Sequence, residues 1–250
     1  MRALGTKLLN INHTCYSKFG WPKPPFYCPA CKSHIWNWVP FSRAIGHGET
    51  KLEPGGRLCP ACGSLERTRH FALYLEQENM LNSLPRMLHF APEKSLENIF
   101  RKSLGDRYIT TDLFMPGVDF KEDITRMGFP DESFDLIYCS NVLEHIPDDR
   151  AAMKEIFRVL SRGGRAIIQV PIKGKVTYED PNITDPRERY LHFGQEDHVR
   201  YYGEDIDKQL KDAGFQVNSF YMLDVLKNDS KEIFKMNLDK RELIHSCIKK

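Results

Sequence analysis

Hydrophobic and polar residues form two alternating patterns along the later part of the chain. Short apolar runs that are typical of buried strands occur at residues 86–91, 108–112, 134–140, 165–170 and 215–222. Segments with a helical pattern lie at residues 93–103, 148–160 and 203–213. A last strand is expected at residues 242–248. Alternating strands and helices of this length predict an α/β fold, with helices covering both faces of a parallel sheet.

The front of the chain follows a different pattern. Residues 1–25 are irregular, and short strands are expected from about Phe26 to Ser64. Residues 65–78 then place apolar side chains at helical spacing, which predicts a linker helix. We therefore expect an N-terminal module at residues 1–64, a linker at residues 65–85 and a large domain at residues 86–250.

Charge is also divided between the two parts. Residues 1–70 hold ten Lys and Arg against three Asp and Glu, whereas residues 71–250 hold 26 against 31. The front part could therefore bind an anion such as RNA. All three tryptophans lie there, either to stack on bases or to fill the core of a small module. No apolar run approaches the roughly 18 residues of a membrane span, and no secretory signal is evident, so a cytoplasmic protein without membrane contact is expected.

Four of the seven cysteines form two identical Cys-Pro-Ala-Cys tetrapeptides, Cys28–Cys31 and Cys59–Cys62. A two-residue spacer turns both thiolates toward one ion, and two such pairs complete a tetrahedral shell around zinc. The alternatives are two redox disulfides or unrelated core thiols, but disulfides seldom persist in the cytosol. A site closed by four cysteines leaves no open position for chemistry, so we expect a structural zinc ion.

The segment from Asp119 to Pro171 contains a long, ordered run of motifs. It reads FPDESFD at residues 129–135, NVLEHI at residues 141–146 and RVLSRGG at residues 158–164. In these motifs the chain resembles the Rossmann-like, class I S-adenosylmethionine-dependent methyltransferases, particularly the type-11 group. The resemblance implies a doubly wound, mostly parallel seven-stranded sheet with S-adenosylmethionine as cofactor.

The resemblance also implies which residues contact the cofactor. Asp112 matches the acid that binds the ribose hydroxyls, although from the sequence alone it could cap a helix. Asp123 and Ile124 match the pair that reads the adenine, and Ser140 and Asn141 lie at the mouth where cofactor and acceptor meet. Ligands of open α/β sheets bind outside the carboxyl ends of the strands, which agrees with these positions.

The first strand of the large domain departs from the family pattern. The family usually has an acid followed by a glycine-rich turn there, but residues 88–93 read LHFAPE and contain no glycine. Ala91 is small enough for close backbone approach to the methionine part of the cofactor. Glu93 either binds the cofactor ammonium or favours a helix N-terminus. A methyltransferase-like scaffold that has lost catalysis therefore remains an alternative.

Methyl transfer to an oxygen acceptor of high pKa needs a general base. One candidate is His145, in the NVLEHI motif. The others lie in a polar insert at residues 173–202, where Tyr178 and His198 suit an acceptor lid; the insert could equally be a solvated surface loop. We expect methyl transfer to an oxygen or nitrogen of a small-molecule or sugar-containing acceptor. The alternatives are an RNA methyltransferase whose zinc module binds RNA, or the non-catalytic scaffold.

Overall fold

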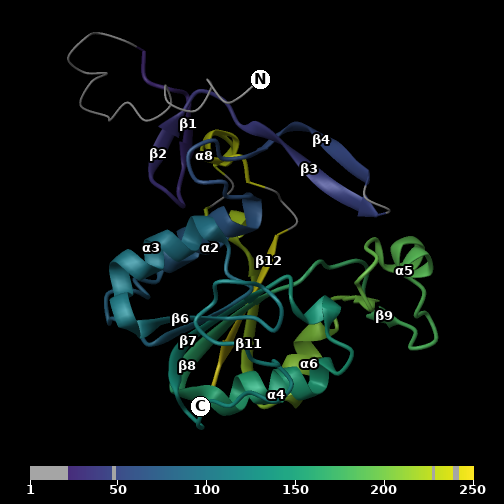
Figure 1. Ribbon diagram of the computed structural model, residues 1–250. Helices are drawn as coiled ribbons and strands as arrows, with labels where there is room; N and C mark the ends of the chain where they lie inside the picture. Colours follow the sequence, from purple (N-terminus) through teal and green to yellow (C-terminus); the bar gives the residue numbers. More distant parts are fainter. Residues whose placement is uncertain (1–21, 47–48, 227–228, 239–241) are drawn as a thin grey trace.

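A six-stranded sheet forms the centre of the molecule in the computed structural model, which describes residues 22–46, 49–226, 229–238 and 242–250 (Figure 1). The strands are β5 (Met87–Phe90), β6 (Tyr108–Thr111), β7 (Phe134–Ser140), β8 (Leu160–Gln169), β11 (Gln216–Tyr221) and β12 (Leu243–Ile248). Their order is β11-β12-β8-β7-β5-β6, and β12 is antiparallel to both of its neighbours. The other neighbouring strands pair in parallel.

The expected seven-stranded sheet therefore differs from the sheet of the described residues, which has six strands. At the edge of the sheet beyond β6, the described chain makes one parallel bridge, between Thr111 and Phe120, and it forms no further strand there. Side chains fold this stretch into turns instead. The Asp119 carboxylate accepts hydrogen bonds from the backbone N–H and the hydroxyl of Thr110, at 2.8 and 2.7 Å. Such local bonds compete with the ladder that another strand would need.

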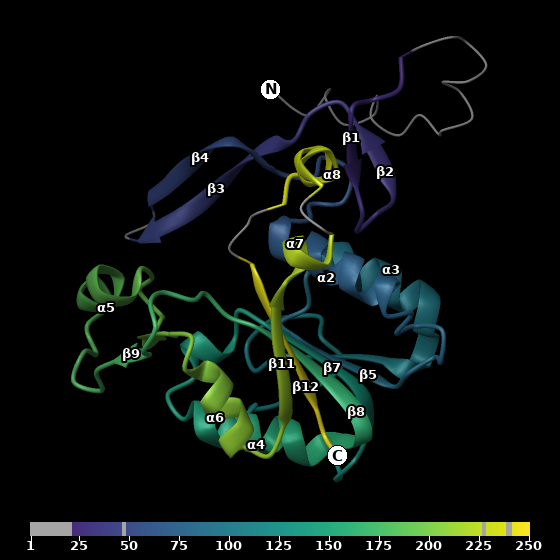
Figure 2. The same ribbon diagram turned by 180° about the vertical axis from the view of Figure 1, so that it is seen from behind.

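Helices cover both faces of the sheet, as the alternating pattern predicts (Figure 2). One face packs against α2 (Glu66–Gln77), α3 (Lys94–Leu104) and α7 (Met222–Val225), and the other against α4 (Asp149–Val159) and α6 (Ile206–Asp212). Successive side chains of β7 point to opposite faces, so Leu136 and Tyr138 join one core and Ile137 and Cys139 the other. Short 3-10 turns lie at η1 (Gly105–Arg107) and η2 (Leu143–His145).

Two small antiparallel hairpins form the N-terminal module; residues 1–21, where an irregular segment was expected, lie outside the described residues. The hairpins are β1 (Phe26–Cys28) with β2 (Ser33–Ile35), and β3 (Val39–Gly46) with β4 (Glu49–Leu58). The module packs against α2 and α8 (Ser230–Met236), and the Phe26 and Phe234 rings lie 5.6 Å apart. A helix from the C-terminal part of the chain therefore supports the N-terminal module.

The insert at residues 173–202 is partly ordered into secondary structure. It contains β9 (Tyr178–Glu179), α5 (Pro186–Phe193) and β10 (Arg200–Tyr201), and α5 contacts β3 of the N-terminal module. Asp185 caps α5 by accepting hydrogen bonds from two backbone N–H groups, and Gly194 ends the helix in a left-handed conformation. Within the described part of the chain, every helix is too short or too polar to span a bilayer.

Candidate functional site

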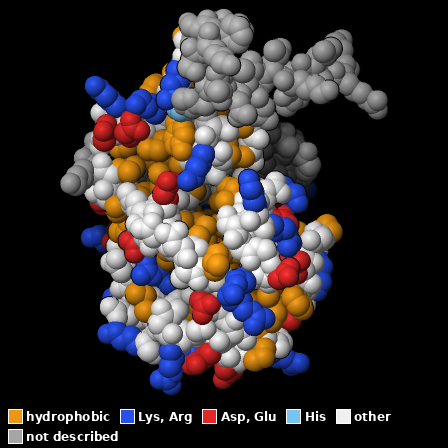
Figure 3. All heavy atoms as spheres, turned by 90° about the vertical axis from the view of Figure 1, so that its left-hand side faces the viewer, with side chains coloured by type: hydrophobic (Ala, Val, Ile, Leu, Met, Phe, Trp, Pro, Cys, Tyr) orange, Lys and Arg blue, Asp and Glu red, His pale blue; other side chains and the backbone are white. Residues whose placement is uncertain are grey.

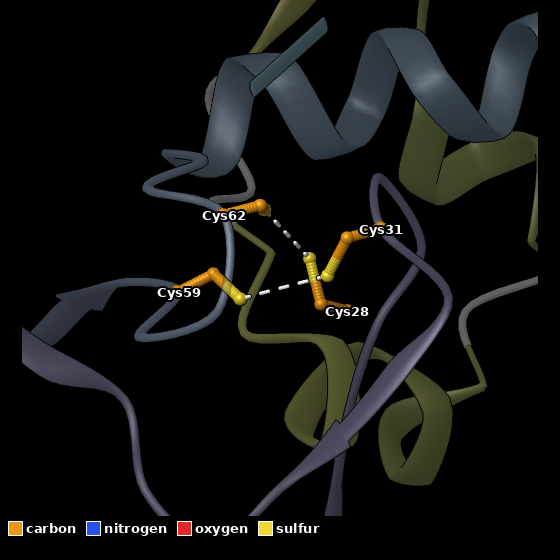
Figure 4. A group of neighbouring side chains, drawn as sticks. All are labelled: Cys28, Cys31, Cys59 and Cys62. Carbon is orange, nitrogen blue, oxygen red and sulfur yellow. Dashed lines mark hydrogen bonds between the residues drawn. The ribbon is translucent and has the colours of Figure 1, made fainter. Parts of the chain in front are cut away.

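The four cysteines of the two tetrapeptides converge in the N-terminal module (Figure 4). The Sγ atoms of Cys28 and Cys62 lie 3.8 Å apart, those of Cys31 and Cys59 lie 3.9 Å apart, and all four fall within 4.8 Å of one another. Tetrahedral zinc with Zn–S bonds of about 2.3 Å requires sulfur atoms about 3.8 Å apart. The four thiols are free, so the disulfide alternative is absent from this structure. The arrangement fits zinc.

The two tetrapeptides share the same local backbone shape. Each is followed by a residue in the left-handed region, Lys32 with φ 57° and Gly63 with φ 76°. The backbone N–H of Gly63 donates to the Cys59 carbonyl and closes the second turn. This turn folds each tetrapeptide back so that both of its thiols face the same point.

Two basic side chains of the module, and one of the adjoining helix α2, are engaged within the protein. Arg57 forms a bidentate pair with Glu66, with N–O distances of 2.6 and 2.9 Å, and Lys32 lies 3.3 Å from Glu76. Arg69 is fully buried and donates to the Ser64 carbonyl. On the face drawn in Figure 3, basic, acidic and hydrophobic side chains are interspersed.

A cavity of about 490 Å³ opens at the carboxyl ends of β5, β6 and β7. Its lining includes five of the residues that the resemblance assigns to the cofactor: Ala91, Asp112, Asp123, Ile124 and Asn141. The volume lies within the usual range of small-molecule and cofactor sites. Three strands and the loops that follow them thus bring together residues that are up to fifty positions apart in the sequence.

Ala91 takes the conformation that glycine usually supplies. Its φ is 45°, in the left-handed region, and its backbone N–H donates to the Thr111 carbonyl at 3.0 Å. An alanine there costs more than a glycine because its Cβ approaches the backbone. The loop after β5 therefore retains a tight turn without a glycine, with one methyl group at the cavity wall.

Two carboxylates of the lining are fixed by local hydrogen bonds. Asp112 Oδ1 accepts from the backbone N–H groups of Phe114 and Met115, at 2.7 and 2.6 Å, so it caps a turn rather than a helix. No hydrogen bond to Oδ2 occurs among the described residues, which leaves that oxygen available to a ligand. Asp123 Oδ1 accepts from the backbone N–H and hydroxyl of Thr125, and these bonds hold the pKa of Asp123 below its ordinary value.

Two predicted cofactor residues lie outside the cavity lining. Ser140 is buried, and its hydroxyl donates to Asn141 Oδ1 at 3.3 Å. Glu93 precedes α3, with one carboxylate oxygen 3.0 Å from His89 Nε2 and the other 3.6 Å from Arg67 Nε. Ser140 thus orients the lining residue Asn141. A direct contact between Glu93 and the cofactor stays a prediction.

His145 and Asp197 also line the cavity; His145 follows β7 and Asp112 follows β6, and these strands lie on either side of β5. Nδ1 of His145 lies 3.2 Å from the Asp197 carboxylate. Burial raises the pKa of Asp197, but the opposing effect of His145 and a hydrogen bond from Gln195 leave it below the ordinary value. His145 is therefore the predicted catalytic histidine that reaches the cavity.

The other two predicted catalytic residues lie elsewhere. His198 is 4% exposed and packs behind His145, with the two ring centroids 4.6 Å apart and the planes nearly perpendicular. Tyr178 is 44% exposed, lies outside the cavity lining and shares a hydrogen bond of 2.7 Å with His192 Nδ1. The structure thus groups His198 with His145, whereas Tyr178 pairs with His192.

Sequence reasoning missed Glu144 and Asp197. Glu144 is 1% exposed, and burial raises its pKa to about 7. Glu144 lies in the NVLEHI motif, and its neighbour His145 is partly exposed. The sequence pattern therefore does not indicate which of these two polar residues is buried. Asp197 is adjacent to His198 in sequence, yet it contacts His145, which is 52 positions away.

Residues 58–168 match the family model described as a methyltransferase domain. Among curated proteins, phosphoethanolamine N-methyltransferase 1 of Arabidopsis thaliana is 33% identical over 48% of this chain and 22% of its own length. A ubiquinone/menaquinone biosynthesis C-methyltransferase of Vibrio campbellii is 27% identical over 52% of this chain and 54% of its own length. The chain thus spans about half or less of these relatives.

Solved structures of similar fold include the YcgJ protein from Bacillus subtilis, at 16% identity and a TM-score of 0.45, covering 71% of this chain and 99% of that one. Phosphoethanolamine N-methyltransferase 2 of Haemonchus contortus matches at 15% identity and a TM-score of 0.45, covering 68% of this chain and 53% of that one. The matched residues include β5, β6, β7 and most of β8, and all of the cavity lining except Asp197. Residues 58–168 are therefore similar to a methyltransferase domain.

Proposed function

We propose that this chain transfers a methyl group from S-adenosylmethionine to an oxygen or nitrogen of a small-molecule or sugar-containing acceptor. The observation that carries the proposal is the cavity at the carboxyl ends of β5, β6 and β7, whose lining holds Ala91, Asp112, Asp123 and Asn141. The family match over residues 58–168 supports it.

The lining residues fit the chemical groups of the cofactor. Asp112 is proposed to accept from the ribose hydroxyls through Oδ2, because Oδ1 is already bound to the loop. Asp123 and Ile124 offer an acceptor and an apolar wall to the adenine. The backbone at Ala91 permits close approach of the methionine part. S-adenosylmethionine carries a methyl group that its sulfonium already activates, so alignment and water exclusion remain for the protein.

The acceptor is proposed to bind at the end of the cavity lined by Asn141, His145 and Asp197. Relatives named for phosphoethanolamine, sterol and quinone methylation support a small-molecule acceptor. Arg57 is paired with Glu66 and Arg69 of α2 is buried, so neither side chain is available to bind RNA. We assign the acceptor-activating role at this end to His145 and the groups around it.

The four-cysteine site is proposed to bind a structural zinc ion. The sulfur spacing matches a tetrahedral shell, and the cysteines are half-buried or buried. Four thiolates leave the ion no position for a substrate, so its effect is on folding. The module is held against α2 and α8 rather than against the cavity.

The test is production of S-adenosylhomocysteine by the purified full chain, incubated with S-adenosylmethionine and pools of acceptors. The pools are phospho-amines, phenols and quinols, sterols, hydroxylated sugars, and transcribed RNA. Turnover with a small-molecule pool, abolished by Asp112→Ala, is the expected result. Turnover with RNA alone would replace the acceptor class, and S-adenosylmethionine binding without turnover in any pool would favour the non-catalytic scaffold.

A further inference from the structure

Three potential metal ligands meet beside the acceptor end of the cavity. Glu144, His145 and His198 each present a ligand atom, and these atoms lie within 4.8 Å of one another. Glu144 and His145 belong to the turn after β7, whereas His198 comes from the insert. We refer to these three residues as the Glu144 cluster. It is separate from the cysteine site, and its member His145 lines the cavity.

Both histidines have an oxygen atom close to Nδ1. Nδ1 of His198 lies 3.1 Å from the Phe193 carbonyl, which can only accept, so this nitrogen carries the proton. Nδ1 of His145 lies 3.2 Å from the Asp197 carboxylate, which favours the tautomer with the proton on that nitrogen. In the neutral rings, the lone pair is then on Nε2. Metal-bound histidines commonly have their second nitrogen fixed by a carboxylate or a backbone carbonyl.

The carboxylate of Glu144 is incompletely satisfied. Its Oε1 accepts from Asn141 Nδ2 at 3.0 Å, but its buried Oε2 has no hydrogen-bond partner among the described residues. Among the described residues, no ion pair to Glu144 is formed. A buried carboxylate oxygen without a partner is costly, and a bound cation removes that cost. Two imidazoles and one carboxylate suit divalent first-row transition metals and leave coordination positions open.

We infer that Glu144, His145 and His198 form a binding site for a divalent transition-metal cation at the acceptor end of the cavity. The ion's role rests on the proposed function. It would hold an acceptor hydroxyl on an open position and lower the pKa of that hydroxyl, whose proton leaves to solvent. His145 then acts as a ligand, and Asp197 as the residue that positions it.

The test uses Co²⁺ as the probe and the full chain with its cysteine site loaded with zinc. Calorimetry and visible absorption follow the titration. We expect one added Co²⁺ per chain, with ligand-field bands but no thiolate-to-metal charge-transfer band. Glu144→Gln preserves the side-chain size and the bond from Asn141, and it should weaken Co²⁺ binding by at least about 100-fold. Asp197→Asn should weaken it by about 10–100-fold, as loss of an outer-shell partner does.

The matched control is Glu188→Gln, which removes an exposed carboxylate from α5 in the same insert and should leave Co²⁺ affinity unchanged. Thermal unfolding without Co²⁺ verifies that each variant is folded. The inference is overturned if wild type binds no added Co²⁺, if Glu144→Gln binds it equally well, or if Co²⁺ enters only with a thiolate charge-transfer band. Titration of the same samples with S-adenosylhomocysteine tests the proposed function separately.

Discussion

At the scale of single residues, Ala91 forms the tight turn of the loop after β5. Its φ of 45° is unfavourable for alanine, and the bond from its N–H to Thr111 holds it there. The hydrogen bond to β6 therefore holds Ala91 in a conformation that alanine disfavours. Such strain is often found at ligand sites, where the surrounding structure maintains it.

Ala91→Gly should raise the free energy of unfolding by up to about 1 kcal/mol, because glycine adopts this conformation without a Cβ penalty. Urea unfolding measures the change. The control is Ala213→Gly, at φ −76° after α6, which should lose about 0.5–1 kcal/mol. If Ala91→Gly lowered the free energy of unfolding as much as Ala213→Gly does, Ala91 would be unstrained.

Asp112 combines two roles that a conservative substitution can separate. In Asp112→Asn, the remaining oxygen still accepts from Phe114 and Met115, but the amide that replaces Oδ2 cannot accept from a ribose hydroxyl. S-adenosylhomocysteine affinity should fall by about tenfold or more, the value of a hydrogen bond to a charged group, while the melting temperature stays close to wild type. Calorimetry showing unchanged affinity would remove Asp112 from the ribose site.

At the scale of elements, Arg200 of β10 connects the insert to the turn that carries Glu144 and His145. Its side chain is 4% exposed and donates to the carbonyls of Leu143 and Pro147, at 3.1 and 2.9 Å. It also pairs with Glu179 at 2.8 Å and lies 3.5 Å from Asp149. One guanidinium therefore satisfies several buried acceptors.

Arg200→Ala should lower the free energy of unfolding by about 3–5 kcal/mol, since the carbonyls and the Asp149 carboxylate lose a buried cation. Urea unfolding of Arg187→Ala, an exposed arginine of the same insert, provides the comparison and should change by less than about 0.5 kcal/mol. Equal, small losses in the two variants would show that the insert is anchored by other contacts.

The sequence predicts most elements because their local signals agree with the fold. Strand β7 occupies residues 134–140 as expected, and α4 begins and ends within one residue of its predicted bounds. The helix α5 was missed in a polar insert, although Asp185 and Pro186 form a normal helix start. The seventh strand was expected from the resemblance. In the structure, the local hydrogen bonds of Asp119 stabilise turns beside β6 instead.

The candidate site was predictable where residues follow strand ends, and not where distant loops meet. Asp112 and Asn141 follow β6 and β7 directly, so their convergence is a property of parallel strands. The left-handed conformation of Ala91 depends on its bond to Thr111. The contact between His145 and Asp197 depends on how the insert folds back, which no local pattern specifies.

At the scale of the whole molecule, the N-terminal module is tied to the linker helix α2 and to the C-terminal part of the chain. Arg69 of α2 donates to Ser64 near the cysteines and to the Asn237 carbonyl after α8, at 2.7 and 2.6 Å. Its guanidinium also lies 4.2 Å above the Trp38 ring. Trp38 therefore packs within the protein, which is one of the two alternatives for the tryptophans, whereas Trp36 is 41% exposed.

Cys62→Ser should remove one zinc equivalent per chain, measured by elemental analysis, and destabilise the protein by more than about 4 kcal/mol through loss of the metal. Cys139→Ala removes a buried cysteine outside the cluster and should retain the zinc. Full zinc content in Cys62→Ser would contradict a site built from all four thiolates.

The central claim is that the cavity after β5, β6 and β7 binds S-adenosylmethionine despite the missing glycine turn. The most direct measurement is calorimetric titration of the purified chain with S-adenosylmethionine and with S-adenosylhomocysteine. The account predicts one site per chain with micromolar affinity for both. No binding of either compound by folded protein would contradict it.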